Sequence, residues 1–340
     1  MKILYHLTIL PPKIPQAEAL SQEIAALGTR FDSELIYLNP NRRAIGVIPR
    51  LLFGWHRLPA IRRREKTVDL HHFYNPDPFP FPILLRMGRP VIYSITSGVA
   101  SSNVRAGYFN RLAAVTVPDQ RSAALLAAAG VTNCRVIRPG IDTARFTFTP
   151  GPDDGLFRLM VGSAPWTEAQ FAAKGVDALL AAAAREPRLH LVFLWRGVLA
   201  EGLARRIAQV GVAEQVTVID RLADVNQVLA GVHAAVTLGA SAGIVKSYPH
   251  SLLDSLAAGK PVLVSRAIPM ADYVAETGCG VVVDDLSAED VLAGVAALRE
   301  GYDNFQSAAR LRGQTDFRRE TMLDAYAALY QALANPHPRQ

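Results

Sequence analysis

Apolar runs rich in β-forming residues alternate with helical segments along the chain, and this alternation constrains the fold more than any other feature. Six runs in the first half are predicted strands: residues 2–7, 33–38, 68–73, 90–95, 114–117 and 135–137. Six more follow: 157–161, 189–195, 215–219, 234–238, 261–264 and 280–283. Helices are predicted between them, including 16–27, 119–129, 175–185, 200–210, 249–258 and 288–299. This order predicts an α/β protein with parallel sheets covered by helices on both faces.

The alternation breaks at residues 150–155, which read Pro-Gly-Pro-Asp-Asp-Gly. These residues are typical of turns and have no apolar period that would pack in a core. We therefore predict an interdomain linker here, between domains 1–149 and 150–316. Because each half repeats the strand–helix order, we expect two Rossmann-like domains facing across a cleft. Ligands of such sheets bind beyond the carboxyl ends of the strands.

The composition excludes several classes of protein. Half of the 340 residues are apolar and 19% are charged, which excludes a disordered chain. The apolar run at residues 1–10 stops at two prolines and is too short for a signal peptide. No segment has the roughly 20 continuous apolar residues of a membrane-spanning helix. The two cysteines, Cys134 and Cys279, cannot form a disulfide framework, so we expect a cytoplasmic protein.

The positive charge is concentrated in one segment. The net charge is +6, but residues 42–66 alone carry +7 and leave −1 for the rest of the chain. Leucines and a tryptophan lie between these basic residues, as in segments that lie on anionic lipid. The residues assigned to this acceptor or membrane side are Arg50, Trp55, Arg62, Arg63 and Arg64. A helix that packs Leu52 and Trp55 on the domain explains the pattern equally well. No nucleic-acid-binding module surrounds the segment, so no nucleic-acid partner is expected.

Residues 246–262 form the most informative motif, Lys-Ser-Tyr-Pro-His-Ser-Leu-Leu-Asp-Ser-Leu-Ala-Ala-Gly-Lys-Pro-Val. Pro249 suits the start of a helix and Gly259 its end. A helix that begins at the carboxyl edge of a sheet offers free N–H groups to a phosphate. Asp254, further along the helix, is placed to accept hydrogen bonds from a ribose. An ordinary buried helix is the alternative.

This motif and four others resemble, in the same order, segments of the retaining glycosyltransferases of family 4 (glycosyl transferases group 1). Residues 254–262 are similar to the family's Glu-Ala-Met-Ala-x-Gly-Lys-Pro-Val segment. The other similar segments are Asp-Leu-His-His at 69–72, Pro-Val-Ile-Tyr-Ser at 90–94, Val-Ile-Arg-Pro-Gly-Ile-Asp at 136–142 with Phe146, and Val-Gly at 161–162 with Lys-Gly-Val-Asp at 174–177. The resemblance covers most of the chain.

The resemblance implies the GT-B fold and a glycosyltransferase activity. The donor, a nucleoside-diphosphate sugar, would bind to domain 150–316. A glycan, a lipid-linked sugar or a small molecule would bind as acceptor to domain 1–149. A final helix within 317–340 would cross back to the first domain. The resemblance also implies transfer of a hexose-type sugar with retention of configuration. Neither a cofactor nor a metal is expected, because cations and helix dipoles stabilise the leaving diphosphate.

The chain departs from the family pattern at four positions. Two glutamates of the family correspond to Lys246 and Asp254, its glycine-strand arginine to Ser163, and its fourth-strand histidine to Thr96. We expect Lys246, with Lys174, to provide the charge for the diphosphate that Ser163 cannot provide. The departures at Lys246, Ser163 and Thr96 favour the competing hypothesis, a non-catalytic GT-B subunit that binds a glycan or a protein partner.

The site predicted from this resemblance and these departures has a catalytic part and a donor-binding part. His72 and Lys246 are the expected catalytic residues, with His72 facing the cleft as a sugar contact. Adjacent strand residues point to opposite faces, so His71 and His72 do not form a metal pair. The expected donor-binding residues are Ser163, Lys174, Arg196, Lys246, Ser247, Tyr248, Pro249 and Asp254, with the backbone of 247–249 at the sugar.

Several alternatives stay open around this site. Arg196 contacts the donor or faces solvent, and Trp166 forms a wall of the donor site or fixes a loop. The proline-rich residues 75–82 form a stiff loop that shapes the acceptor side or is merely structural. No glycine-rich dinucleotide motif follows the first strand and no Walker loop is present, which argues against a dehydrogenase and an ATPase. Peripheral attachment to the inner face of the cytoplasmic membrane is the expectation that follows if residues 42–66 bind lipid.

Overall fold

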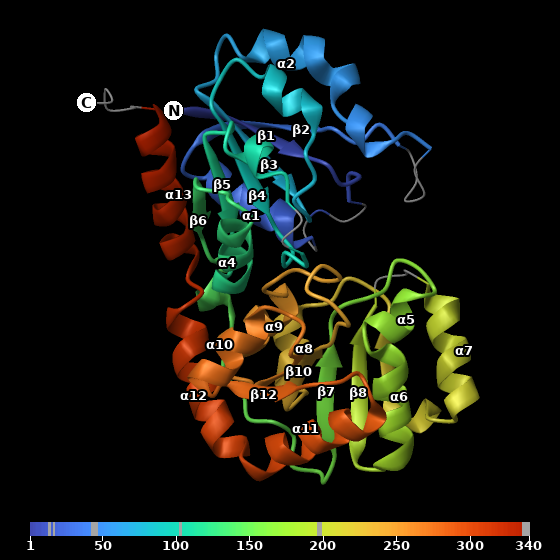
Figure 1. Ribbon diagram of the computed structural model, residues 1–340. Helices are drawn as coiled ribbons and strands as arrows, with labels where there is room; N and C mark the ends of the chain where they lie inside the picture. Colours follow the sequence, from blue (N-terminus) through green and yellow to red (C-terminus); the bar gives the residue numbers. More distant parts are fainter. Residues whose placement is uncertain (13–14, 16–17, 42–46, 102–103, 196–198, 335–340) are drawn as a thin grey trace. The chain divides into compact units, whose positions relative to one another are not determined.

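The chain folds into two compact units, which the computed structural model describes except at residues 13–14, 16–17, 42–46, 102–103, 196–198 and 335–340 (Figure 1). Unit 1 comprises Met1–Gly140 and Arg319–Gln340, and unit 2 comprises Ile141–Arg318. The first change of unit therefore falls at residue 140, before the turn-rich segment that we predicted as the boundary.

Unit 1 is built on a six-stranded parallel sheet in the order β2-β1-β3-β4-β5-β6. Its strands are β1 (Lys2–Leu7), β2 (Asp32–Tyr37), β3 (Leu70–Asn75), β4 (Val91–Ile95), β5 (Ala114–Val117) and β6 (Cys134–Val136). Its α-helices are α1 (Ala19–Gly28), α2 (Leu58–Arg64), α3 (Ala106–Phe109), α4 (Gln120–Ala128) and α13 (Arg319–Ala334). Short 3-10 helices lie at Arg50–Leu52, Trp55–Arg57 and Pro82–Arg86.

Strand β3 begins two residues later than the sequence pattern predicts. The N–H groups of Thr67 and Val68 donate to the carbonyl of Arg64, so the chain is still leaving α2 at these residues. The N–H of Asp69 donates to the carbonyl of Lys2, and regular pairing with β1 starts at Leu70. Apolar character alone could not locate this change from helix end to strand.

Unit 2 repeats the architecture with the sheet order β12-β11-β10-β7-β8-β9, again parallel. Its strands are β7 (Phe157–Val161), β8 (Leu189–Leu194), β9 (Val216–Ile219), β10 (Ala234–Thr237), β11 (Val262–Ser265) and β12 (Gly280–Val283). Its α-helices are α5 (Gln170–Ala173), α6 (Val176–Arg185), α7 (Ala200–Val210), α8 (Val225–Ala230), α9 (His250–Ala257), α10 (Met270–Thr277), α11 (Ala288–Glu300) and α12 (Tyr302–Thr315). Short 3-10 helices lie at Thr143–Arg145 and Ala213–Gln215.

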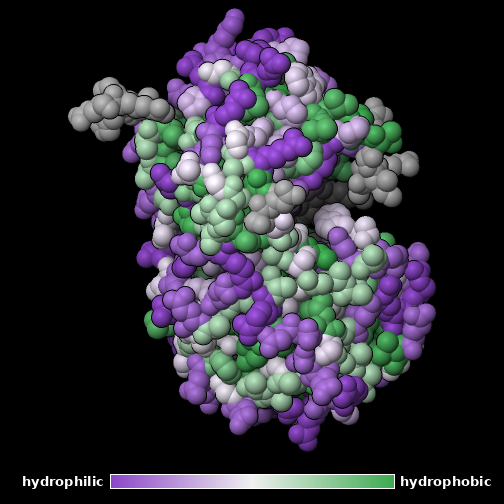
Figure 2. All heavy atoms as spheres, viewed as in Figure 1, coloured by the Kyte–Doolittle hydropathy of each residue, from purple (hydrophilic) through white to green (hydrophobic). Residues whose placement is uncertain are grey.

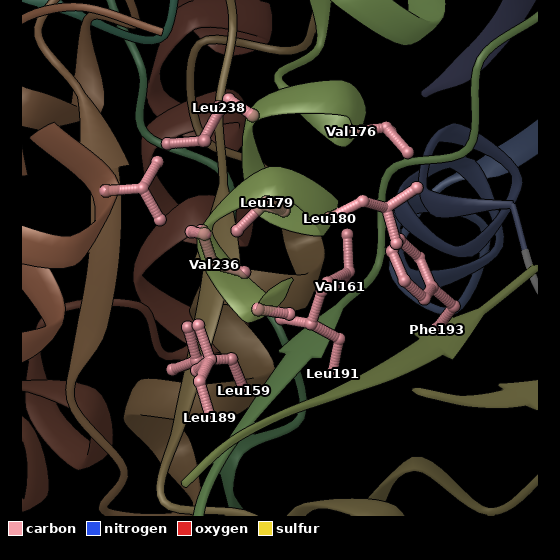
Figure 3. Packing of buried hydrophobic residues seen from close by; sticks show 14 of the residues in the cluster. Leu159, Val161, Val176, Leu179, Leu180, Leu189, Leu191, Phe193, Val236 and Leu238 are labelled. Carbon is pink, nitrogen blue, oxygen red and sulfur yellow. The ribbon is translucent and has the colours of Figure 1, made fainter. Parts of the chain in front are cut away.

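One of the two buried clusters of unit 2 fills the space between α6 and the sheet (Figure 3). Leu159, Leu189 and Leu191 come from neighbouring strands, and Leu179 and Leu180 cover them from the helix. All five side chains are at most 1% exposed. This packing fixes β7 and β8, and so fixes the loops that leave their carboxyl ends.

The turn-rich segment 150–155 is held on unit 2 by His233, which is half-buried. His233 accepts a hydrogen bond from the N–H of Arg158 at Nδ1 (3.0 Å), and its Nε2 lies 3.0 Å from the carbonyl oxygen of Pro152. A Cβ atom on Gly151 would lie 2.7 Å from the same ring. The segment is therefore a fixed turn of unit 2, although its composition is typical of a linker.

Candidate donor and acceptor sites

Unit 2 reverses its strand order between β7 and β10, which lie side by side although the chain runs from β7 to β8 and β9 first. In open parallel sheets, ligands bind at the carboxyl ends of the strands at such a point. The loops that leave this edge are residues 162–169, after β7, and 238–249, after β10. The second loop leads directly into α9.

Gly162 brings the β7 loop against the first turn of α9. A Cβ atom built on Gly162 would lie 2.5 Å from Cβ of Ser251, so only glycine allows this approach. Sequence reasoning did not assign this role, although a glycine directly after a strand was a signal for it. The contact joins the β7 loop to the helix that follows the loop after β10.

The amino end of α9 carries several of the predicted donor residues. Pro249 occupies the N-cap position, and its side chain makes no capping hydrogen bond to the first turn. Ser247 is fully buried, and its hydroxyl finds no hydrogen-bond partner among the described residues. Lys246 is half-buried just before it, and Asp254 is half-buried on α9. An uncapped helix end with a lysine and a buried unpaired hydroxyl is favourable for an anion.

Two predicted donor residues have other roles. The ring of Tyr248 is 5% exposed and packs in the core against Tyr273 and Phe317, so only its backbone remains for a ligand. Lys174 is 6% exposed, and its ammonium donates to the carbonyl of Ala164 at 2.9 Å. Burial lowers the pKa of Lys174 to about 8. We predicted that Lys174 binds the diphosphate, whereas the structure shows that it holds the β7 loop.

The remaining predicted donor residues are Ser163 and Arg196. Ser163 is half-buried and follows Gly162 in the β7 loop, at the strand reversal. Arg196 lies outside the described residues. Thr96, which replaces the family's histidine, follows β4 in unit 1, where its N–H donates to the carbonyl of Asn75.

The prediction that His72 is an open sugar contact is corrected by the structure. His72 is fully buried on β3, beneath α13. Its Nδ1 lies 2.6 Å from the hydroxyl of Tyr330 and its Nε2 lies 2.6 Å from that of Ser94. Burial lowers its pKa to about 3, so the ring is neutral. The histidine therefore fastens α13 to the sheet and is not available to substrate.

The neighbouring His71 belongs to a second buried group, on the other face of the sheet. Its Nε2 lies 3.0 Å from a carboxylate oxygen of Glu65, and its Nδ1 lies 2.9 Å from Nε2 of His6. Burial lowers the pKa of both histidines. As expected for adjacent strand residues, the side chains of His71 and His72 point to opposite faces of the sheet. Among the described residues, no group of three or more His, Cys, Asp or Glu side chains is arranged to hold a metal.

The proline-rich loop after β3 is held at the carboxyl edge of unit 1 by polar side chains. Arg50 forms a two-bond ion pair with Asp77 and lies 4.2 Å above the ring of Phe79. Asn75, 1% exposed, donates to the Asp77 carboxylate at 2.7 Å. The hydroxyl of Tyr93, on β4, donates to the carbonyl of Phe79 at 2.9 Å. The prediction placed Arg50 on the acceptor or membrane side, and the structure shows that it fixes this loop.

Within residues 47–66, the exposed residues form what we call the apolar–basic surface. It comprises the exposed apolar residues Val47, Ile48, Leu51, Leu52 and Trp55 and the exposed basic residues Arg57, Arg62, Arg63 and Lys66. In Figure 2, hydrophobic spheres gather at the right-hand edge of the unit that holds α2, beside the grey atoms. The predicted residue Arg64 is not part of this surface, because it pairs with Glu34 at 2.6 Å.

The alternative in which Leu52 and Trp55 anchor the segment to the domain is not observed. These side chains are 52% and 38% exposed, respectively, and the buried anchors are Phe53 and Ile61. No helix within the described ranges is long and apolar enough to cross a bilayer.

Comparison with known proteins supports the sequence resemblance. Residues 168–313, within unit 2, match the family model described as glycosyl transferases group 1. Among proteins of curated function, none matches the chain in sequence.

Solved structures are similar over almost the whole chain. Sucrose-phosphate synthase from Thermosynechococcus elongatus has 15% identity and a TM-score of 0.76, with 98% of this chain and 99% of that one covered. HepE from Anabaena, in complex with UDP and glucose, has 15% identity and a TM-score of 0.72, with 98% and 100% covered. The lipopolysaccharide glycosyltransferase WaaG has 14% identity and a TM-score of 0.68, with 97% and 99% covered. The GT-B fold is confirmed. At these identities the likeness establishes the fold alone.

Proposed function

We propose that this protein is a glycosyltransferase that moves a sugar from a nucleoside-diphosphate-sugar donor, bound by unit 2, to an acceptor bound by unit 1. The observation that carries the proposal is the contact of Gly162 with the uncapped first turn of α9, at the strand reversal. The match of residues 168–313 to group 1 glycosyl transferases and the UDP complexes of HepE support it. Retention of configuration and a hexose-type sugar follow from the family resemblance.

The diphosphate is proposed to bind at the amino end of α9. Lys246 provides the positive charge there. The buried hydroxyl of Ser247 is a further hydrogen-bond donor, and N–H groups of the first turn complete the site. Asp254, on the same helix, is proposed to accept a hydrogen bond from the ribose. In this arrangement the leaving diphosphate is stabilised by the lysine and the helix dipole, without a cofactor.

Calorimetry with nucleotides tests this site directly. Lys246→Glu replaces an attractive charge by a repulsive one, so we expect it to abolish binding of the nucleoside diphosphate that the wild type binds. Arg145→Glu, a charge reversal outside the proposed site in the same unit, is the matched control and should bind normally. Unchanged affinity of the Lys246→Glu protein would overturn the assigned role of this lysine.

A panel of nucleotide sugars separates an enzyme from the competing non-catalytic GT-B subunit, which the replacements at Lys246, Ser163 and Thr96 favour. Hydrolysis or transfer with one donor supports the enzyme and identifies the base and the sugar. Binding of a glycan without turnover of any donor in the panel would instead support the non-catalytic subunit.

The apolar–basic surface is proposed to attach unit 1 to an anionic membrane and so to bring a lipid-linked acceptor within reach. Each basic residue near such a membrane contributes about 1 kcal/mol. We expect sedimentation with anionic vesicles, weakening with salt, and none with neutral vesicles. Replacing Leu51 and Leu52 by serine should reduce it, whereas Leu311→Ser, at a leucine of unit 2 that is even more exposed, should not. Sedimentation equal with and without anionic lipid would contradict the attachment.

A further inference from the structure

The β7 loop presents an exposed tryptophan from a fixed backbone. Trp166 is 68% exposed, against 38% for Trp55 and 1% for Trp195. The backbone N–H of Trp166 donates to the side-chain oxygen of Gln170 at 2.8 Å, and the carbonyl of Ala164, two residues earlier, accepts a hydrogen bond from the buried ammonium of Lys174. Pro165, between these two points, is buried. The backbone that carries Trp166 is therefore held in place, while its indole is largely exposed, which is unfavourable for so large an apolar surface in a free protein.

The end of the loop that follows Trp166 packs beside the end of β8 and α7. Phe171, on α5 just after the loop, packs its ring 5.8 Å from that of Trp195 at the end of β8. Glu168, two residues after the tryptophan, pairs with Arg205 and Arg206 of α7. Trp166 therefore lies on the β8 side of the strand reversal, and the amino end of α9 lies on the other side of the same loop.

A nucleotide bound at α9 would extend along this edge of the sheet, from its diphosphate at α9 to its base near Trp166. The proposed function puts its diphosphate at the amino end of α9, next to the contact of Gly162 with Ser251, where the β7 loop begins. Trp166 is four residues further along, so it lies within about 14 Å of that contact. The base of a nucleoside diphosphate is its one aromatic part, and stacking on an aromatic side chain is favourable for every base.

We propose that the indole of Trp166 is the stacking surface for the nucleobase of the donor. This inference rests on the proposed function, because it requires that a nucleoside diphosphate bind at α9. It assigns the recognition of the base to the β7 loop, with the buried Lys174 as a positioning residue that holds the loop rather than a ligand of the phosphate.

Binding measurements with UDP, ADP, GDP and inorganic pyrophosphate test the proposal. For the nucleotide that the wild type binds most tightly, we expect Trp166→Ala to weaken affinity at least about fivefold. Trp166→Phe keeps an aromatic ring and should lose less. Inorganic pyrophosphate has no base to stack, so its affinity should be the same in all three proteins.

Intrinsic fluorescence gives a second readout, which does not depend on the stability of the alanine variant. The nucleotide should quench the wild type and the control Trp55→Phe, and should not quench Trp166→Phe. Tight nucleotide binding with equal affinity in Trp166→Ala, or with quenching retained in Trp166→Phe, overturns the stacking and leaves the proposed function intact. A wild type that binds none of the nucleotides overturns both.

Discussion

The hydroxyl of Tyr330 on α13 lies 2.6 Å from Nδ1 of His72 on β3, so the last helix of the chain closes over a histidine in the middle of the sheet. The ring of His72 also stacks on Tyr74, with 4.1 Å between ring centroids. His72, which the sequence pattern predicts as a catalytic residue, thus links two segments that are 258 positions apart in the chain.

Tyr330→Phe removes this hydroxyl and leaves a buried ring nitrogen without a partner. The expected loss is about 1–3 kcal/mol in the free energy of unfolding of unit 1, because an unpaired buried polar atom loses its hydration without compensation. Urea unfolding followed by a unit 1 probe measures it. Tyr326→Phe is the comparison and should cost less, since the contacts of its hydroxyl with Ser94 (3.4 Å) and Glu23 (3.5 Å) are longer. Equal and negligible effects of both changes would contradict this role of Tyr330.

Stability should fall as the solution is acidified below pH 6.5, the ordinary pKa of histidine. Burial lowers the pKa of His6, His71, His72 and His233, so the folded state holds them neutral while the unfolded state takes up protons. Their contribution is complete above pH 6.5 and is lost as the pH falls, for His72 down to about pH 3. The urea midpoint measured from pH 8 to pH 5 follows this loss.

His233→Asn tests the contribution of His233 to that pH dependence. Asparagine keeps an acceptor for the N–H of Arg158 and cannot take up a proton. The variant should therefore lose less stability than the wild type between pH 7 and pH 5. A wild-type midpoint that does not change over this range would refute the expected effect of all four histidines.

Gly162→Ala should weaken nucleotide binding about tenfold or more, since the added Cβ collides with Ser251 and moves either the β7 loop or the start of α9. Ser251→Gly removes the atom that the new Cβ would meet. Calorimetry on the double variant should show most of the affinity restored, at a stability cost of about 1 kcal/mol for glycine in a helix. A double variant as weak as Gly162→Ala alone would show that this contact is not the cause.

Arg50→Lys keeps the charge next to Asp77 but loses the second hydrogen bond and the flat contact with Phe79. We expect hydrogen exchange in residues 76–82 to become faster, and KM for the acceptor to rise several-fold. The stability cost should be at most about 1 kcal/mol, because the ion pair is partly exposed. Nucleotide affinity should not change, as the loop belongs to unit 1. A change in nucleotide affinity with unchanged exchange would contradict this role of Arg50.

The sequence predicted the sheets well because each strand is a local apolar run. Its motifs also located the amino end of α9, since Pro249 and Gly259 act on their own neighbours. The burial of His72 could not be predicted, because it depends on tyrosines in the final helix. The pairing of Arg50 with Asp77 was hidden for the same reason, since a basic segment does not show which arginine meets which distant carboxylate. Lys174 was recognised as important, but its direction depends on how the β7 loop folds back.

The N–H of Ile141 donates to the carbonyl of Phe317 at 2.9 Å, and Ile141 pairs with Arg318 as a parallel bridge. The first and last residues of unit 2 are therefore neighbours, so the unit is inserted into unit 1 as a closed module. Residues 141–318 can in principle be excised or exchanged for the corresponding piece of a relative with two chain cuts at one place. Such chimaeras would allow the donor to be changed independently of the acceptor.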